Sequence, residues 1–345
     1  FQAKYRGKVA SLTATDFAEA YEMMETIYDL RGRLGSYASL NFSTDTANTA
    51  YQQFIAKMGD LGSALSQKLV FFDLEWNQLD DDKAQAILDD PAIAKYRYFM
   101  EADRRYKPYN LSEIEEQILI EKSVTGSDAW TRFFTQLTSS FTFDWQGEEV
   151  NMTHVLNKMR DADRDIREMA WRKLTDKLQE KSMELTYIFN TLALDKANSD
   201  KRRGYDSWVS SRNLSNKATD EVVDALIETV TSNYGLVARQ YRLKRALLGL
   251  DELLDYDRYA PLNLKENEDF YTWNEAKAIV LKAFENFDTE MKEAAELFFD
   301  KNWIHAPVTP TKRGGAFASP TVVSANPFVF LNYMGDARNI TTLAH

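Results

Sequence analysis

The stretch DIREMAWRKLTDKLQEKSMELTYIFNTL, residues 165–192, decides the fold class of this chain. Apolar residues recur in it every three or four positions, which is the spacing of one face of an α-helix. The pattern continues to Gly204, a residue type that ends helices, so we predict one amphipathic helix of about 35 residues from Asp165 onward. The residues of the apolar face are Ile166, Ala170, Leu174, Leu178, Leu185, Ile188 and Leu192.

Helical patterns also dominate the chain before this stretch. Residues 13–34 and 47–72 each carry an apolar stripe, and antiparallel pairing of the two helices would bury both stripes. The acidic triplet at residues 80–82 lacks the spacing and the closing glutamate of a calcium-binding EF-hand, so it indicates the start of another helix. Further helices are expected over residues 92–106, 112–122 and 127–137 before residue 141, and over residues 218–249, 273–287 and 289–300 after it.

Two segments interrupt the helical pattern. In residues 141–152 aromatic residues alternate with polar ones before the turn Gln146-Gly147, which predicts a short β-hairpin and a boundary between helical domains 1–140 and 141–345. In residues 302–332 four prolines separate strand-sized apolar runs, which predicts a small β-sheet. The predicted fold class is therefore predominantly α, with long antiparallel helices and a small sheet near residues 302–332. The apolar runs are Trp303-Ile304, Ala316-Phe317, Val322-Val323 and Phe328–Leu331.

Composition excludes several classes of protein. The formal net charge is −11 and 28% of the 345 residues are charged, which argues against a general nucleic-acid binder because such proteins need a basic face. Cysteine is absent, which excludes disulfides and thiolate zinc ligands. No apolar run approaches the ~20 residues of a membrane-spanning helix. The chain begins without methionine and ends inside a helical pattern, so we expect a segment of a longer protein.

The candidate chemistry rests on three histidines and one pair of glycines. His154 is interpreted as structural or exposed, and His305 as exposed in a proline-rich loop, although it could also line a cleft. His345 ends an apolar helical pattern, where a buried polar group is the simplest interpretation, although the first histidine of an H-E-x-x-H zinc motif would stand in the same place. Gly314-Gly315 lacks the spacing of a phosphate-binding loop and predicts a tight turn into a strand whose edge a peptide backbone could approach.

Several motifs in a fixed order resemble the oligoendopeptidase F family, a branch of the thimet-oligopeptidase-like zinc metallopeptidases. Together they span almost the whole chain. They are Leu30–Ala38, Lys122–Gly126 with Ala129-Trp130, Lys312–Phe317, Asn332-Tyr333 and Thr342–His345.

The resemblance implies a helical fold that encloses a channel, and hydrolysis of short peptides by a zinc-activated water in the cytoplasm. His345 would be the first zinc ligand on the active-site helix, beside the small sheet. The general base and the other ligands would follow it, so no catalytic residue is expected within the chain, and the segment alone is expected to be inactive and to hold no zinc. Residues 1–140 would be a lid-like domain, and residues 141–345 the first part of the catalytic domain. The residues matched to substrate binding are Gly314, Gly315, Ala316, Phe317 and Tyr333.

Partners implied by the resemblance are short peptides, without nucleic acid or membrane. The alternative hypothesis is a non-catalytic helical scaffold or peptide-binding module with the same fold. The acidic, helical composition suits both hypotheses equally.

Overall fold

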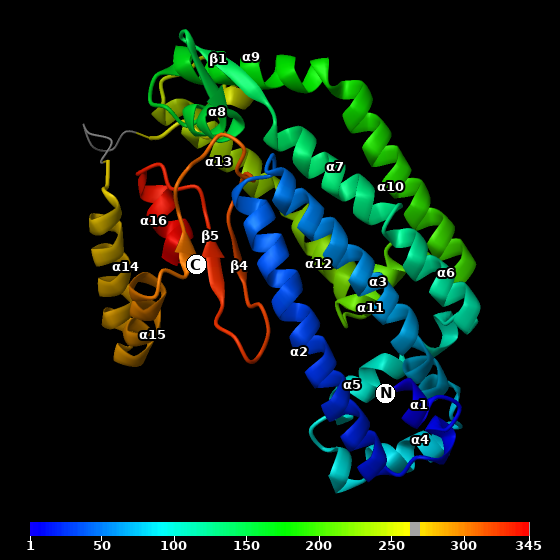
Figure 1. Ribbon diagram of the computed structural model, residues 1–345. Coiled ribbons are helices and arrows are strands. Elements are labelled where there is room, and N and C mark those ends of the chain that lie inside the picture. The colour runs from blue at the N-terminus through cyan, green and yellow to red at the C-terminus, as the bar shows by residue number, and fades with distance from the viewer. Residues whose placement is uncertain (263–269, 345) are drawn as a thin grey trace. The chain divides into compact units, whose positions relative to one another are not determined.

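The computed structural model describes residues 1–262 and 270–344. Within these residues the chain forms mainly α-helices, with one two-stranded and one three-stranded sheet (Figure 1), which confirms the predicted fold class. The residues group into two compact units. Unit 1 comprises Phe1–Arg31, Ala56–Phe133 and Leu185–Gly235, and unit 2 comprises Gly32–Ile55, Phe134–Glu184 and Leu236–His345. The domain division at residue 140 and the lid role stay predictions.

Unit 1 is built around an aromatic core between the two long helices expected near the N-terminus. These are α2 (Ala14–Thr44) and α3 (Thr49–Gln78). Phe17 of α2 packs edge-on against Phe72 and Trp76 of α3, with ring centroids 5.8 and 5.1 Å apart. The predicted pairing is therefore confirmed where the start of α2 meets the end of α3, whereas Tyr28 and Leu61 of the two stripes are exposed. The other elements of the N-terminal third are α1 (Gln2–Tyr5), η1 (Val9–Ser11), α4 (Asp81–Leu88), η2 (Pro91–Ile93), α5 (Arg97–Arg104), η3 (Lys107–Tyr109), α6 (Glu113–Ser123) and α7 (Ser127–Ser139).

Several predicted helices differ from the structure. The first two are longer than predicted, because α2 continues beyond residue 34 to Thr44 and α3 beyond residue 72 to Gln78. The helix expected over 92–106 is reduced to α5, because Asp90 caps a 3-10 turn that Pro91 begins. The single helix expected from Asp165 is two, α9 (Arg164–Glu180) and α10 (Ser182–Arg203), separated at Lys181. The helix expected over 218–249 is likewise α12 (Asp220–Ser232) and α13 (Tyr234–Leu247). A short helix that was not predicted is α11 (Ser210–Ser215).

Local hydrogen bonds and backbone conformation account for these ends. The amide of Asn233 donates to the carbonyl oxygen of Thr229 at 2.7 Å, so this side chain competes with the helical backbone between α12 and α13. Lys181 has φ −98° and ψ 13°, outside the helical well, and its N–H closes the last turn of α9 on Lys177 at 3.1 Å. Gly204 has φ +77° and ends α10, as the sequence predicts.

Unit 2 contains both sheets. The predicted hairpin is confirmed as β1 (Thr142–Trp145) and β2 (Glu148–Asn151), with positive φ at both turn residues Gln146 and Gly147. It packs on α8 (Met152–Lys158) and α9 through buried aromatic side chains. The second sheet has the order β3-β5-β4, with β3 parallel and β4 antiparallel to the central strand. Its strands are β3 (Ile304–His305), β4 (Phe317–Ser319) and β5 (Phe328–Phe330).

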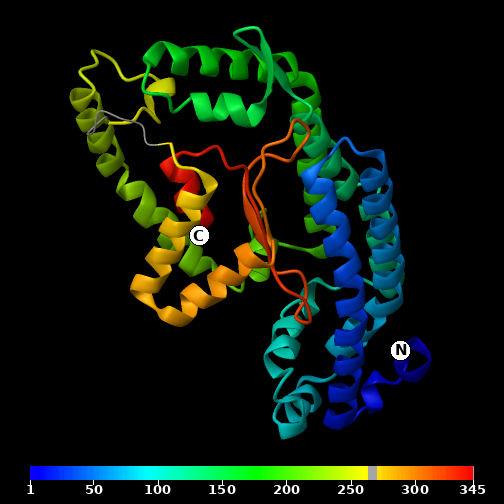
Figure 2. The ribbon, with the colours of Figure 1, turned by 60° about the vertical axis from the view of Figure 1, so that its left-hand side comes forward.

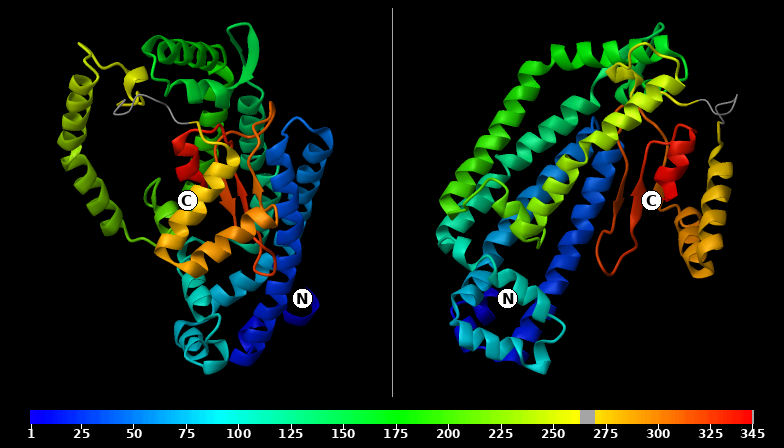
Figure 3. Two further views of the ribbon diagram at one scale, coloured as in Figure 1. Left: turned by 90° about the vertical axis from the view of Figure 1, so that its left-hand side faces the viewer. Right: turned by 180° about the vertical axis from the view of Figure 1, so that it is seen from behind.

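The small sheet lies where the sequence predicts it, but one of its runs is not a strand. Val322 and Val323 belong to the loop that joins β4 to β5 (Figure 2), and the side chain of Val323 is fully exposed. The helices α14 (Trp273–Phe287) and α15 (Thr289–Asp300) have the predicted bounds and pack against each other (Figure 3). The last helix, α16 (Ala337–Ala344), shares a core with α14 and the end of β5.

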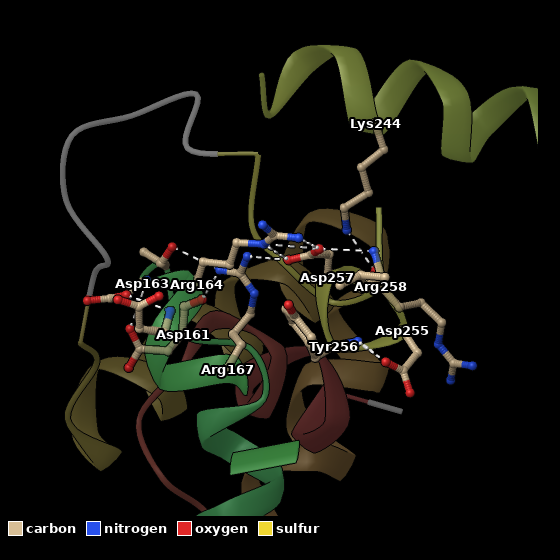
Figure 4. A network of polar contacts seen from close by, with 12 residues as sticks. Asp161, Asp163, Arg164, Arg167, Lys244, Asp255, Tyr256, Asp257 and Arg258 are labelled. Carbon is tan, nitrogen blue, oxygen red and sulfur yellow. Dashed lines mark hydrogen bonds and ion pairs between the residues drawn. The ribbon is translucent and has the colours of Figure 1, made fainter. Parts of the chain in front are cut away.

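A buried ion-pair network ties the chain after α13 to the start of α9 (Figure 4). Asp257, in the short helix η4 (Asp255–Asp257), is completely buried. Its carboxylate accepts from Arg164 Nη2 at 2.8 Å and from Arg167 Nη2 at 2.9 Å. Burial acts to raise the pKa of Asp257, but the two arginines and the N–H of Leu254 hold it below its ordinary value.

Among the residues that the structure covers, no helix is long and apolar enough to cross a bilayer.

Candidate active site

A pocket of about 270 Å³ lies inside unit 2, where the start of β4 meets the first turns of α16. Helix α8, the loop after it and the residues that follow β5 complete its wall. Segments widely separated in the sequence thus share one small space. The lining residues are Thr153, Leu156, Asn157, Arg160, Gly315, Ala316, Leu331, Asn332, Met334, Asp336, Arg338, Asn339 and Thr342.

Asp336 fixes the start of α16. Its Oδ1 accepts from the N–H of Asn339 at 2.7 Å, which is the hydrogen bond of an N-cap residue. Its Oδ2 accepts from the amide of Asn157 at 2.8 Å, so the helix start is tied to α8. Gly335 precedes the cap with φ +90°, and a Cβ atom there would lie 2.2 Å from a ring carbon of Phe270. Only glycine fits this approach to α16.

The turn before β4 is held in place by an amide side chain. Gly315 has φ +86°, as expected for the predicted tight turn. Asn332 Nδ2 donates to the carbonyl oxygens of Arg313 at 3.1 Å and Gly315 at 3.0 Å. In the part of the chain that the structure describes, β4 pairs with β5 alone, so its other edge has no strand partner there. Such an edge is the kind of surface on which a peptide adds a strand.

Lys312 supports the same turn from inside. Its side chain is buried, and Nζ donates to the carbonyl oxygens of Pro307 at 2.7 Å, Leu331 at 2.6 Å and His305 at 3.2 Å. All three N–H groups of the ammonium are thereby used. Burial lowers the pKa of Lys312 to about 8 because the charged form loses water. The lysine joins the ends of β3 and β5 next to the turn into β4.

The structure brings only some of the sequence-predicted substrate residues into this pocket. Gly315 and Ala316 line it, whereas Gly314 and Phe317 do not. The ring of Phe317 stacks on Phe330 with centroids 4.7 Å apart. All four residues lie in the turn before β4 or in β4 itself. This is the segment that the sequence predicts to be an edge strand.

Tyr333 lies in a separate pocket of about 310 Å³ together with Trp273 and Phe299. Its hydroxyl donates to the carbonyl oxygen of Tyr271 at 2.8 Å, and burial raises the pKa of this phenol. Tyr333 therefore does not share the pocket at β4. His345, the predicted zinc ligand, lies outside the described residues.

The other two histidines do not form a metal site. His305 is not exposed in a loop: it lies half-buried in β3, with its ring centroid 6.0 Å from that of Phe330. The alternative that it lines a cleft is confirmed, because it lines a pocket of about 460 Å³ within unit 2. Burial, and secondly Lys312, lower its pKa. His154 packs against Trp145, and burial lowers its pKa as well. Across residues 1–262 and 270–344 no three His, Asp or Glu side chains gather as metal ligands, so these residues alone do not fit a zinc ion.

Sequence reasoning missed the polar residues that complete the pocket. Asn157, Arg160 and Arg338 carry no recognisable motif, and about 180 residues separate the first two from the third. The one available signal was the Asp336-x-x-Asn339 spacing of a helix cap before an apolar run.

Comparison with known proteins shows the family to which this helical chain with its small edge-stranded sheet belongs. The sequence profile "Peptidase family M3" matches residues 157–345, and the profile "Oligopeptidase F" matches residues 75–143. Because the first match covers more than half of the chain, the protein belongs to peptidase family M3, in its oligoendopeptidase F group.

Named relatives agree with this assignment. Oligopeptidase PepF of Bacillus subtilis is 28% identical over 352 residues, which cover 99% of this chain and 52% of the relative. Group B oligopeptidase PepB of Streptococcus agalactiae is 30% identical over 336 residues, 94% of this chain and 55% of the relative. The crystal structure of oligoendopeptidase-F from Enterococcus faecium superposes with a TM-score of 0.69 at 24% identity, over 88% of this chain and 57% of that one. The chain spans about half the length of the curated relatives it matches.

Proposed function

We propose that the complete protein is a zinc-dependent metalloendopeptidase that hydrolyses short peptides in the cytoplasm. One observation supports a peptide site in this chain most directly. Gly315 and Ala316, at the start of the free edge of β4, line one pocket with residues of α16. His345 follows α16 directly in the sequence. A peptide paired with β4 would therefore run beside the helix that leads to the proposed metal ligand.

The described residues have a binding role in this proposal. The edge of β4 offers backbone donors and acceptors to the main chain of an extended peptide. Asn332 and Lys312 hold the turn before β4 and so fix where that pairing begins. When bound, zinc supplies a water that ionises near neutral pH and polarises the substrate carbonyl. Because these residues hold no complete zinc site, no catalytic step is assigned to them.

The test uses the complete protein and compares two histidine variants. His345→Ala is expected to remove the bound zinc and to abolish hydrolysis of an internally quenched fluorescent peptide, because catalytic zinc needs three protein ligands. His154→Ala is the matched control and should keep both properties. The measurements are zinc per protein by elemental analysis and the initial rate of hydrolysis.

Two results would contradict the proposal. Zinc and activity that survive in His345→Ala would show that this residue is not a ligand. A wild-type protein without metal and without hydrolysis would support the alternative, a helical scaffold or peptide-binding module.

A further inference from the structure

Three arginine side chains gather beside the pocket at the start of β4. The guanidinium carbons of Arg160 and Arg258 lie 4.6 and 4.5 Å from the ring centroid of Tyr259. Arg160 and Arg338 both line the pocket itself. Arg160 donates to the carbonyl oxygen of Leu156 at 2.9 Å and Arg258 to the hydroxyl of Tyr259, so neither bond neutralises a charge. Over the described part of the chain, none of the three is in an ion pair.

These positive charges gather in a protein that is acidic as a whole. The chain has 53 aspartates and glutamates against 42 lysines and arginines, so a carboxylate partner would be easy to provide. The acid in the pocket, Asp336, uses its two oxygens to accept from Asn157 and from the N–H of Asn339. Its hydrogen bonds therefore serve the start of α16, and the nearby arginines keep their free N–H groups.

The field around these arginines favours a bound anion. Burial lowers the pKa of Arg160 and the like charge of Arg338 lowers it further, while Tyr259 and Asp336 oppose this shift only in part. Arg338 also stands in the first turn of α16, where the partial positive charge of the helix N-terminus opposes a cation. An anion held between Arg160 and Arg338 would relieve both repulsions. The planar fork of an arginine matches a carboxylate in two parallel hydrogen bonds.

The position of the pocket indicates which carboxylate it receives. Gly315 and Ala316, which begin the free edge of β4, line the same wall, so a peptide that ends there would bring its last residue to the arginines. A short peptide always carries a C-terminal carboxylate, whereas an internal loop of a folded protein does not present one. Recognition of this group would thus favour short substrates without contacting their sequence.

We propose that Arg160 and Arg338 form a carboxylate-binding subsite at the start of β4, which takes the C-terminal carboxylate of a short peptide substrate. The inference rests on the proposed peptidase function. It adds a specificity determinant whose role differs from that of the proposed metal ligand His345, although Arg338 stands on the helix that leads to His345.

The test compares peptides that differ only at the C-terminus. The complete wild-type protein should cleave a free-acid peptide about tenfold better, in kcat/KM, than the same peptide as its C-terminal amide, because charge-assisted hydrogen bonds are lost with the amide. Arg338→Met should abolish this preference, and Arg338→Lys should retain part of it, since lysine keeps the charge without the fork. Arg338 is exposed, so its replacement should leave the fold intact. Arg160→Met provides a second variant.

The control is Arg245→Met, at an exposed arginine of α13 that does not line the pocket, and it should keep the wild-type preference. A carboxylate could come from the C-terminus of the peptide or from an acidic side chain. A pair of amidated peptides that end in glutamate or glutamine distinguishes these two sources. A preference for glutamate that depends on Arg338, without one for the free acid, would overturn the assignment to the C-terminus. If Arg338→Met lost the same fraction of its activity on all peptides, Arg338 would not recognise the C-terminal carboxylate, and the proposed subsite would be wrong. If the wild-type protein cleaves no peptide, the proposed function fails instead.

Discussion

At the scale of single residues, Asp257 shows how one buried charge holds the chain after α13 against the start of α9. Removing its charge leaves Arg164 and the buried Arg167 without their counter-ion, and Arg167 Nε already lacks a hydrogen-bond acceptor. We therefore expect Asp257→Asn to lower the free energy of unfolding by roughly 3–5 kcal/mol, the usual effect of breaking a buried ion pair from one side. Urea denaturation followed by circular dichroism measures the change.

The control for this prediction is a solvent-exposed pair. Glu180 binds Lys177 at 2.8 Å with more than half of its side chain exposed, so Glu180→Gln should leave the free energy of unfolding almost unchanged. Equal effects of the two substitutions would mean that Asp257 acts as an ordinary surface charge.

Single residues also show how far the site could be predicted from sequence. Gly315 was identified because a glycine turn before a strand has a local signature, and Ala316 was matched through the family resemblance; both line the pocket. Arg160 and Arg338 have no local signature, because only the fold brings the end of α8 to the start of α16. His305 was misplaced because the prolines near it suggested a loop, whereas its strand forms through parallel pairing with distant β5.

At the scale of elements, α16 depends on the single glycine before its cap. In Gly335→Ala the new methyl group would meet Phe270, and alanine is unfavourable at φ +90°. We expect a loss of roughly 1–3 kcal/mol in the free energy of unfolding and a lower kcat/KM, because the start of α16 must shift. Thermal denaturation and peptide hydrolysis by the complete protein measure the two effects.

Gly59 provides a matched glycine in a different setting. It lies inside α3, exposed, with no atom within 4 Å of a Cβ built there. Gly59→Ala should therefore stabilise the protein by about 0.5–1 kcal/mol through helix propensity. If Gly335→Ala also stabilised the protein, the chain before α16 would accept a side chain at position 335. The proposed requirement for glycine there would then be wrong.

Elements differ in how well sequence determines them. Apolar periodicity correctly located most helices, and α14 and α15 to the residue, because amphipathic stripes and capping residues are local signals. The breaks at Lys181 and Asn233 were missed because the apolar face continues across each of them. A helix that ends and restarts without changing its face leaves the periodicity almost unaltered.

At the scale of the whole molecule, the pH dependence of stability should follow two carboxyl groups inside unit 1. Burial raises the pKa of Asp73 to about 7, with the charge of Asp103 as the second cause, and burial raises the pKa of Asp103 to about 6. Asp103 accepts from Asn77 at 2.9 Å, but Asp73 Oδ1 is buried without a partner. Both groups thus hold their protons more tightly in the folded protein than at the ordinary value of 3.8.

The sign of the effect follows from this difference in proton binding. Each group contributes its full stability below the pKa of the unfolded chain and loses it as the pH rises through the folded pKa. The free energy of unfolding should therefore fall by roughly 4 kcal/mol between about pH 5 and about pH 8, with the larger part from Asp73. Asp73→Asn should flatten most of this slope, because the amide has the same shape and no charge to bury. Asp60→Asn, at an exposed position of α3, should keep it. Urea denaturation across this pH range provides the measurement, and an unchanged slope in Asp73→Asn would show that Asp73 ionises as freely in the folded protein as in the unfolded chain.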